Sequence, residues 1–295
     1  MSFIPGINGQ PKVIVTSLDG ASVEIYLLGA TIVSYKTSSG QEVLSVSSAA
    51  IFDGAAPIRG GIPIVFPQFA LQGPLPLHGF ARTELWTVVG AAEPGRIVLS
   101  LCDSEKTRAS QWPHAFELTY TVTFDSARLT TELSVSNPAS AGAPFAFEAL
   151  LHTYLFLGPD NVTAQGSAAR IAGLQGLTCI AKPSTGYEPA RLEERDSIQL
   201  EGEFDRIFTP ISRPLVISGI SNGAISQVTV EAQASVRSSG PRLGTMAAPL
   251  DVVIWNPGAA RAKVIADLGD EDWRNFVRVL PKVACRATSP RNAVS

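Results

Sequence analysis

The sequence predicts an all-β protein, built as a large antiparallel β-sandwich. Short runs rich in β-branched and aromatic residues recur along the chain, and Gly, Pro, Asn, Asp and Ser separate them. The alternation of strands with helices that marks a parallel sheet is missing from the pattern. The nine clearest runs are residues 12–17, 22–28, 30–37, 95–102, 117–124, 129–137, 227–232, 250–257 and 262–268.

The run 129–137 shows the expected periodicity. Leu129, Leu133 and Val135 recur with a period of two, so they share one face of a half-buried antiparallel strand. Patterns typical of helices are scarce. The acidic segment 270–276 predicts one short helix of a turn or two.

No linker-like stretch, fixed-period repeat or low-complexity tract divides the chain. We therefore predict a single sandwich domain over residues 1–280. Residues 281–295 show no periodicity and predict an irregular C-terminal tail.

Composition limits the classes of function. Hydrophobic residues make up 45% of the 295 residues and charged residues 17%, which supplies a large core and argues against disorder. The net charge is -3, from 23 basic and 26 acidic residues, so the chain has no overall attraction for nucleic acid or an anionic membrane. Anion binding must therefore come from a local cluster of Arg or Lys side chains.

The cysteines and the N-terminus bear on location. Cys102, Cys179 and Cys285 are an odd number without the spacing of a metal site, which predicts free thiols in a reducing compartment. The first residues lack the pattern of a signal peptide, and no apolar run approaches the roughly 20 residues that span a bilayer. We therefore expect a cytoplasmic protein.

Residues 58–82 form the first stretch suited to chemistry. Gly and Pro crowd this segment and impose an irregular backbone, and it holds Arg59, Gln68, His78 and Arg82. Two guanidinium groups beside a Gly-rich turn can hold a phosphate, because each donates paired, charge-assisted hydrogen bonds to two oxygens. The alternative is that both arginines pair with carboxylates or lie on the surface.

His152 interrupts the apolar run 145–157 and is the second candidate. A period of two places it on the same strand face as Glu148 and Tyr154. Histidine suits acid–base chemistry because its pKa of about 6.5 lies near neutrality, although a hydrogen-bonded core histidine is the alternative. Glu148 should not touch His152, since four residues along a strand separate two Cα atoms by roughly 13 Å. His114 lies among bulky residues and is interpreted as structural.

Two further segments hold candidate sugar-binding residues. Asp205 and Arg206 are adjacent in a predicted strand, so one of them can face a pocket while the other faces solvent. A carboxylate accepts hydrogen bonds from two neighbouring sugar hydroxyls, and Trp255 offers an apolar face for a sugar ring. The alternatives are a surface strand end for Asp205 and a core position for Trp255.

The order of the motifs carries a resemblance. The segments IRGGIPIVFPQF, LHGFAR, LHTYL, GEFDRIF, VVIWNP and ADLGDEDWRNFV follow one another as in the hexose-6-phosphate mutarotases, also called glucose-6-phosphate 1-epimerases. The chain resembles this branch of the aldose 1-epimerase family. The resemblance implies a β-sandwich of the galactose mutarotase type that interconverts the α and β anomers of glucose 6-phosphate. We further expect no metal or other cofactor, a small hexose 6-phosphate as partner, no nucleic acid or membrane partner, and a monomer.

The resemblance also implies roles for individual residues. His152 resembles the general acid that protonates the ring oxygen as the sugar opens. His78 resembles the second active-site histidine, which holds and polarises the substrate. The residues that resemble substrate-binding groups are Arg59 and Arg82, as a phosphate clamp, and Gln68 and Asp205, as hydroxyl-binding residues.

Residues 276–281, FVRVLP, depart from the family pattern. The family carries a glutamate at the position of Leu280, and that glutamate removes the proton from the anomeric hydroxyl. Leucine has no atom that accepts a proton. Two interpretations follow: a binder of phosphorylated sugars or weak enzyme, or a C-terminal segment from about Arg278 that differs from the usual one. An epimerase of unphosphorylated sugars is a third alternative.

Overall fold

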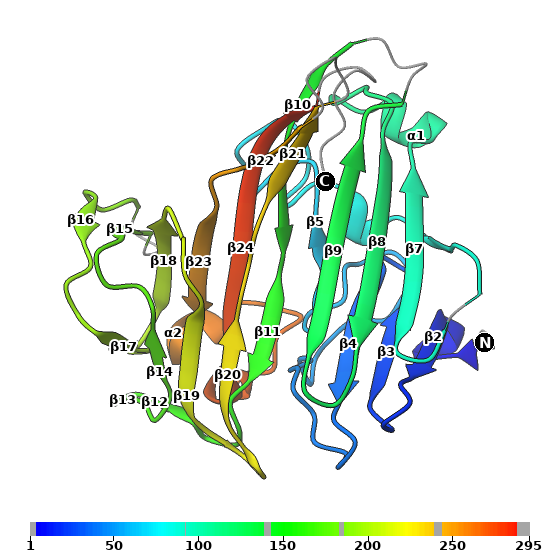
Figure 1. Ribbon diagram of the computed structural model, residues 1–295. Coiled ribbons are helices and arrows are strands. Elements are labelled where there is room, and N and C mark those ends of the chain that lie inside the picture. Colours follow the sequence, from blue (N-terminus) through cyan, green and yellow to red (C-terminus); the bar gives the residue numbers. More distant parts are fainter. Residues whose placement is uncertain (1–3, 92, 139–142, 183–185, 239–243, 288–295) are drawn as a thin grey trace.

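The computed structural model describes residues 4–91, 93–138, 143–182, 186–238 and 244–287. Figure 1 shows a molecule built from long strands, with a few short helices at its edges. All pairs between the labelled strands of the described residues are antiparallel. The predicted all-β, antiparallel fold is confirmed. Within the described ranges, no helix is long and apolar enough to cross a membrane.

Two four-stranded sheets come from the first half of the chain. The strands of the first are β1 (Ile4–Pro5), β2 (Pro11–Thr16), β3 (Ser22–Tyr26) and β4 (Thr31–Lys36). Those of the second are β6 (Thr87–Val88), β7 (Arg96–Cys102), β8 (Glu117–Phe124) and β9 (Leu129–Ser136). The six longer strands match the predicted runs in this region, whereas the two-residue strands β1 and β6 were not predicted.

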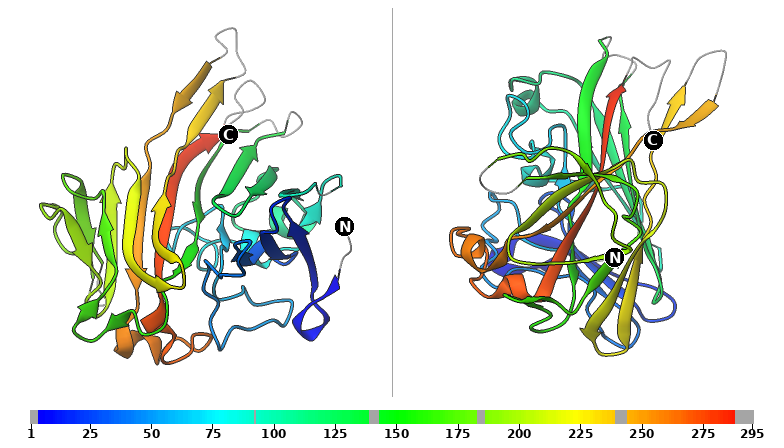
Figure 2. Two further views of the ribbon diagram at one scale, coloured as in Figure 1. Left: turned by 60° about the horizontal axis from the view of Figure 1, so that its bottom comes forward. Right: turned by 90° about the vertical axis from the view of Figure 1, so that its left-hand side faces the viewer.

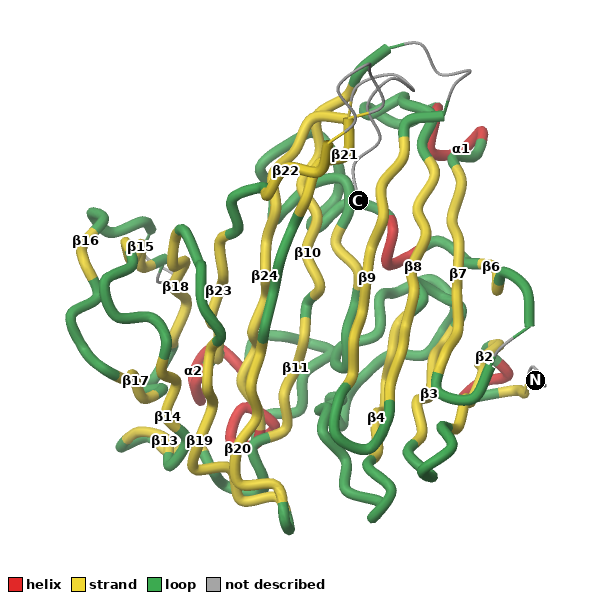
Figure 3. Tube along the Cα trace, in the orientation of Figure 1, coloured by secondary structure: helices red, strands yellow, loops and turns green. Residues whose placement is uncertain are grey.

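The eight-stranded sheet brings together segments from far apart in the sequence, as Figure 3 shows. Its strands, in spatial order, are β16 (Arg191–Leu192), β15 (Thr178–Ala181), β18 (Phe204–Thr209), β23 (Asp251–Asn256), β24 (Phe276–Ala287), β10 (Phe145–Leu151) and β5 (Ile64–Val65), with β11 (Thr153–Phe156) also paired to β24.

The remaining elements lie mainly in the second half. A third four-stranded sheet has the order β17 (Ser197–Gln199), β14 (Arg170–Ala172), β19 (Leu215–Asn222) and β20 (Ile225–Val230). Two hairpins are β12 (Val162–Thr163) with β13 (Gly166–Ser167), and β21 (Ser235–Ser238) with β22 (Gly244–Ala247). The helices are α1 (Glu105–Arg108), α2 (Gly258–Ala262) and the 3-10 turns η1 (Ile7–Gly9), η2 (Ala81–Thr83) and η3 (Asp272–Asn275).

One hydrophobic core joins the sheets. Leu118 and Tyr120 of β8 are fully buried, and Ile254 of β23 and Val277 of β24 belong to the same cluster. Side chains alternate between the two faces of a strand, so the neighbours of these core residues on β23 and β24 point to the opposite face. That opposite face of the eight-stranded sheet carries the candidate site.

The strand predicted over residues 262–268 is wrong. The chain leaves β23 at Asn256, whose Oδ1 accepts a hydrogen bond from Gly258 N at 2.9 Å, and α2 begins there. Val264 N then donates to Arg261 O, so the chain continues to turn. The β-branched residues of this run favour a strand only weakly, and local hydrogen bonds override that propensity.

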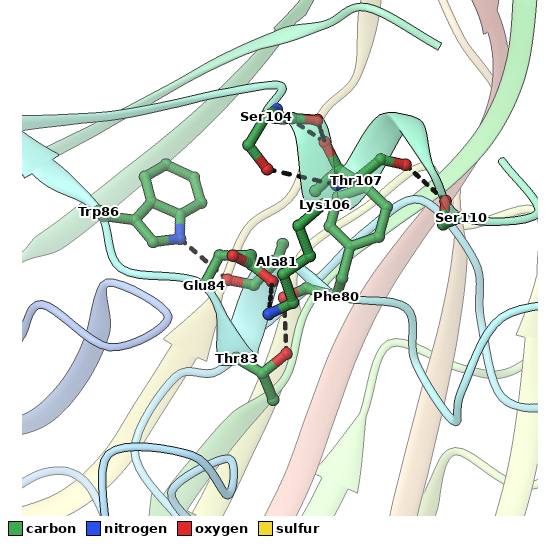
Figure 4. A network of polar contacts seen from close by, with 9 residues as sticks. All are labelled: Phe80, Ala81, Thr83, Glu84, Trp86, Ser104, Lys106, Thr107 and Ser110. Carbon is green, nitrogen blue, oxygen red and sulfur yellow. Dashed lines mark hydrogen bonds and ion pairs between the residues drawn. The ribbon is translucent and has the colours of Figure 1, made fainter. Parts of the chain in front are cut away.

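The helix predicted over residues 270–276 is confirmed in part, as the 3-10 turn η3. The helix α1 was not predicted. Ser104 accepts from Thr107 N at 3.2 Å while Thr107 Oγ1 accepts from Ser104 N at 2.8 Å, which forms a capping box. Figure 4 shows this reciprocal pair.

The C-terminal strand continues through the boundary predicted at residue 280. Residues 282–287 of β24 pair with residues 145–150 of β10, so residues 281–287 belong to the sheet rather than to an irregular tail. The missing periodicity of residues 281–295 predicted the tail, but pairing with β10 keeps residues 282–287 in the sheet. Residues 288–295 of the predicted tail lie outside the described residues. Figure 2 shows β24 running along the sheet in two further views.

The thiols of Cys102, Cys179 and Cys285 are free, as predicted.

Candidate active site

A tight loop presents His78, and the carbonyl of Phe66 holds its backbone. Phe80 N and Ala81 N both donate to Phe66 O, at 3.1 and 3.2 Å. Gly79 has a φ of +70°, and a Cβ atom there would lie 2.3 Å from the same oxygen, so only glycine fits. His78 itself has a φ of 68°, a left-handed conformation that is uncommon for residues with a Cβ atom and frequent at functional positions.

Gly79→Ala should destabilise the protein by about 2 kcal/mol or more. A left-handed φ costs an alanine about 1–2 kcal/mol, and the methyl group adds a clash with Phe66 O. Gly90→Ala is the matched control, since Gly90 has a φ of +71° and no atom lies within 4 Å of the place that a Cβ would take there. Urea denaturation of both variants measures the difference. Equal losses would contradict the steric explanation.

Gln68 is buried, and both of its amide donors are used. Nε2 donates to Ala70 O and to Leu75 O, each at 3.0 Å, and Oε1 accepts from Leu75 N at 2.9 Å. These bonds fasten the loop ahead of His78. The geometry therefore gives Gln68 a scaffolding role in place of the hydroxyl-binding role that the sequence predicted.

His78 is oriented by the backbone of Ala70. Its Nδ1 accepts a hydrogen bond from Ala70 N at 3.1 Å, and its own N donates to Ala70 O at 3.0 Å. Because Nδ1 is an acceptor, the proton of the neutral imidazole resides on Nε2. The centre of the His78 ring lies 5.5 Å from the ring centre of Phe69 and 5.4 Å from the ring centre of His152.

His152 lies between β10 and β11 and is 6% exposed. Its N donates to Pro63 O at 2.9 Å, which fixes the backbone. The ring meets His78 edge-on and lies 5.4 Å from the ring of Tyr154. Its Nδ1 has no hydrogen-bond partner among the described residues. The alternative of a satisfied core histidine therefore does not hold, and the two histidines form one pair.

Arg82 belongs to the 3-10 turn η2, which a polar network holds in place. Trp86 Nε1 donates to Ala81 O at 2.9 Å, and Thr83 Oγ1 donates to Phe80 O at 3.0 Å (Figure 4). The guanidinium of Arg82 donates from Nη2 to the carbonyl of residue 77 at 2.6 Å, while its buried Nε has no partner among the described residues.

Two further guanidinium groups face the histidines. Arg59 donates from Nη2 to Asp267 Oδ1 at 2.8 Å, and its buried Nε has no partner among the described residues. Arg278 is 6% exposed. Its Cζ atom lies 3.5 Å from the ring centre of Trp255 and 4.3 Å from the ring centre of Tyr154. Three arginines thus gather where the sequence predicted two.

The sequence reasoning missed Arg278. One signal was available, because Arg278 is a lone charge in the apolar run Val277–Leu280 of a strand. What the sequence lacks is the pairing: Tyr154 and Trp255 lie directly across from Arg278 on its two neighbouring strands. Trp255, predicted either to face a sugar or to fill the core, instead stacks on this guanidinium.

Both histidines are held neutral. Burial has the largest effect on the pKa of His78, and the charges of Arg82, Arg278 and Arg59 act in the same direction, so that this pKa is lowered to about 3. Burial also lowers the pKa of His152 well below its usual value, with Arg278 as the strongest charged neighbour. At neutral pH the site therefore contains neutral imidazoles among cations.

The arginines remain charged at neutral pH. Burial, together with the charge of Arg59, lowers the pKa of Arg82 to about 10 and that of Arg278 to about 9. Asp205 lies across from Trp255 on β18, in the same cross-strand row as Arg278. Burial raises the pKa of Asp205 to about 6. Asp205 therefore lies on the same face as Arg278, whereas Arg206 points to the other face.

Leu280 occupies the site face next to His152. Pairs 150–282 and 153–279 flank the gap between β10 and β11 with no shift of register, which sets Leu280 opposite His152. Leu280 is 2% exposed and packs with Val65, Phe69, Leu150 and Val253. The position that the resemblance assigns to a base is therefore part of a small apolar cluster.

Neither Glu148 nor His114 takes part. Glu148 forms an ion pair with Lys282 at 2.7 Å and accepts a hydrogen bond from Phe69 N at 2.9 Å, so its carboxylate is occupied. His114 packs edge-on against Trp112 at 4.7 Å, as a structural residue would. Both observations agree with the sequence interpretation.

A cavity of about 600 Å³ opens beside the turn η2. Arg82, Leu77, Phe80 and Lys106 are among the residues that line it. Neither histidine of the pair is among its lining residues, so we place the site at the histidine pair and not in this cavity. Lys106 is also engaged, in an ion pair with Glu84 at 2.6 Å (Figure 4).

Comparison with known proteins shows the family of the chain. The sequence profile of aldose 1-epimerases matches residues 12–282. The chain belongs to the aldose 1-epimerase family. Members of this family are isomerases of carbohydrates, so the arginines and histidines lie in a family whose substrates are sugars.

Two aldose 1-epimerase relatives carry the same provisional name, glucose-6-phosphate 1-epimerase. The protein from Cenchrus ciliaris is 30% identical over 283 residues, which cover 93% of this chain and 78% of the relative. The protein from Salmonella typhimurium is 30% identical over 274 residues, which cover 90% and 80%.

Solved structures support the fold. A provisionally assigned mutarotase from Salmonella typhimurium superposes with a TM-score of 0.75 at 22% identity, covering all of this chain and 95% of that one. A galactose mutarotase related enzyme from Lactobacillus acidophilus superposes with a TM-score of 0.64 at 18% identity, covering 92% and 85%. The predicted galactose mutarotase type of sandwich is thereby confirmed.

Proposed function

We propose that the chain binds hexose 6-phosphates, with glucose 6-phosphate as the principal ligand, and interconverts their α and β anomers. The observation that carries the proposal is the pair Arg59 and Arg82, each with a buried, unpartnered Nε, beside His78 and His152. The provisional names of the relatives from Cenchrus ciliaris and Salmonella typhimurium support glucose 6-phosphate as the ligand.

The two arginines supply the binding step. A phosphate has three terminal oxygens, and two guanidinium groups can each donate paired, charge-assisted hydrogen bonds to them. With the phosphate on Arg59 and Arg82, the sugar ring lies toward His78 and His152. The Nε2–H of His78 then donates to a sugar oxygen, and Asp205 accepts from hydroxyls.

Phosphate binding should also raise the pKa of His152, the proposed general acid. In the free site, burial lowers the pKa of each histidine most, and the charges of Arg59, Arg82 and Arg278 lower it as well. A dianionic phosphate offsets part of this positive charge and raises both pKa values. His152 can then take up a proton and deliver it to the ring oxygen, while the anomeric hydroxyl gives its proton to solvent water in place of the base that Leu280 does not supply. The open aldehyde rotates about C1–C2 and closes on its other face.

Exchange spectroscopy by NMR tests the enzyme proposal directly. Purified protein should exchange the α and β anomers of glucose 6-phosphate faster than buffer alone. A well-positioned acid contributes about 10²–10⁴-fold to a rate, and so does a base, so a site with only the acid should be a slow member of its family. Exchange no faster than buffer, with a folded protein, would remove the enzyme proposal.

A second candidate is a binder of phosphorylated sugars with little turnover. Leu280 favours it, because this buried side chain stands where a base is needed. The binder predicts saturable binding of glucose 6-phosphate in calorimetry together with anomer exchange at the buffer rate. Absence of binding would exclude both candidates. The cytoplasmic location and the monomeric state remain predictions from the sequence.

Arg59→Ala combined with Arg82→Ala should weaken glucose 6-phosphate binding about a hundredfold or more. A hydrogen bond to a charged group contributes about 1.5–3 kcal/mol, and each 1.4 kcal/mol is a tenfold change in Kd. Arg128→Ala, at an exposed arginine, is the matched control. Calorimetric titration with glucose 6-phosphate gives the Kd of the unsubstituted protein, the double variant and the control. An unchanged Kd in the double variant would favour an epimerase of unphosphorylated sugars.

A further inference from the structure

Arg278 has unused hydrogen-bonding capacity on the site face of β24. Its side chain is more than nine-tenths buried, yet Nε and Nη2 have no partner among the described residues. Buried N–H groups without an acceptor are costly, so two adjacent ones mark a place for a ligand. Nε and Nη2 form the side-on edge of the guanidinium, which matches the two oxygens of a carboxylate.

The two faces of this guanidinium are already covered. The ring of Trp255 lies 3.5 Å from its central carbon and that of Tyr154 lies 4.3 Å away. Cross-strand pairing places these aromatic residues on either side of Arg278. The stack holds the guanidinium in one orientation and leaves its edge for hydrogen bonds. An arginine with a purely structural role would have an acceptor on that edge.

Arg278 and Arg82 come from different elements, β24 and η2, and act most strongly on different histidines. After burial, Arg82 is the strongest charged influence on the pKa of His78. After burial, Arg278 is the strongest charged influence on the pKa of His152. Arg59 also lies outside β24, since it precedes β5. With Arg59 and Arg82 assigned to a phosphate, the guanidinium of Arg278 is left for another group of the ligand.

We propose that the site takes a phosphorylated sugar acid, whose phosphate binds Arg59 and Arg82 and whose carboxylate binds the edge of Arg278. The proposal rests on the phosphate clamp of the proposed function and adds a second anionic group to the ligand. Asp205, in the same row as Arg278, favours a singly charged carboxylate over a second phosphate, since repulsion grows with ligand charge. A sugar acid with its carboxylate at C1 lacks an anomeric hydroxyl, so it competes with glucose 6-phosphate.

Calorimetry with 6-phosphogluconate, glucose 6-phosphate and glucose 1,6-bisphosphate tests the proposal. The unsubstituted protein should bind 6-phosphogluconate at least tenfold more tightly than glucose 6-phosphate. Arg278→Met keeps about the length of the side chain and removes the paired N–H donors, so it should abolish this preference by weakening 6-phosphogluconate binding at least tenfold more than glucose 6-phosphate binding. Arg278→Lys keeps the positive charge but lacks the paired N–H donors of the guanidinium. It should give an intermediate preference for 6-phosphogluconate over glucose 6-phosphate.

The controls separate this proposal from the proposed function. Arg261→Met removes an exposed cation that also acts on Asp205, and it should leave the preference intact. Equal affinity for the two monophosphates in the unsubstituted protein would overturn the sugar-acid proposal alone. Tightest binding of the bisphosphate would overturn the choice of a carboxylate. If the protein bound 6-phosphogluconate but did not bind glucose 6-phosphate, this result would support the sugar-acid proposal and count against the proposed function.

Discussion

Leu280→Glu should raise the rate of glucose 6-phosphate anomer exchange by about 10²–10⁴-fold over the unsubstituted chain. The strand register sets residue 280 across from His152, and the Cβ atoms of such neighbours lie about 4.5–5.5 Å apart. A carboxylate there gives the site a proton acceptor beside its acid. Exchange spectroscopy of both proteins under one set of conditions measures the ratio.

The same substitution should lower the free energy of unfolding by several kcal/mol, because it buries a carboxylate among apolar side chains. Leu280 packs with Val65, Phe69, Leu150 and Val253. Arg278 lies two residues earlier on the same face, and its charge offsets part of this cost. A faster but less stable protein is therefore the expected outcome.

Leu280→Gln is the matched control for this experiment. Glutamine has nearly the shape of glutamate and disturbs the apolar cluster in a similar way, but its amide is a very weak base. We expect it to lose stability without gaining rate. If both variants exchange anomers at the unsubstituted rate while remaining folded, the absent base does not explain slow turnover, and the acid side of the mechanism has to be questioned.

The sequence predicted the individual groups of the site better than their contacts. Arg59, His78, Arg82 and His152 were predicted and lie together, because Gly- and Pro-rich motifs and a histidine in an apolar run are visible locally. Arg278 was missed because its importance comes from strand pairing with residues more than 20 and more than 120 positions away in the chain. No local pattern specifies such a register.

Local hydrogen bonds explain the other differences. Gln68 looked available for a ligand, but its amide is used within seven residues, at Leu75. The run 262–268 has strand-like composition, yet a side-chain bond at Asn256 starts a helix just before it. In each case a contact of one side chain with nearby backbone decided the structure, and residue composition alone does not reveal such a contact.

The protein should become less stable as the pH falls from about 6.5 toward 4. The pKa of His78 is about 3 in the folded chain, against about 6.5 when unfolded, and that of His152 is also well below its ordinary value. Between these values the unfolded chain binds more protons, so the free energy of unfolding rises with pH. Each such proton contributes about 1.4 kcal/mol per pH unit.

Asp205 opposes this effect over part of the range. Its pKa is about 6 in the folded chain, against about 3.9 when unfolded, so between these values the folded chain binds the extra proton. The contribution of Asp205 to the free energy of unfolding therefore falls as the pH rises through this window. The unfolded chain binds two more protons at the histidines, and the folded chain binds one more at Asp205, so unfolding takes up about one net proton. The free energy of unfolding should therefore rise by roughly 1.4 kcal/mol per pH unit between about pH 4 and 6.

Urea titrations at several pH values, on two variants, separate these contributions. Asp205→Asn removes the opposing group, so the slope of unfolding free energy against pH should about double. His78→Gln removes one histidine, and the slope should then fall close to zero while an amide oxygen still accepts from Ala70 N. An unchanged slope in both variants would mean that neither group titrates differently in the folded chain, and the neutral, cation-lined histidine pair would have to be abandoned.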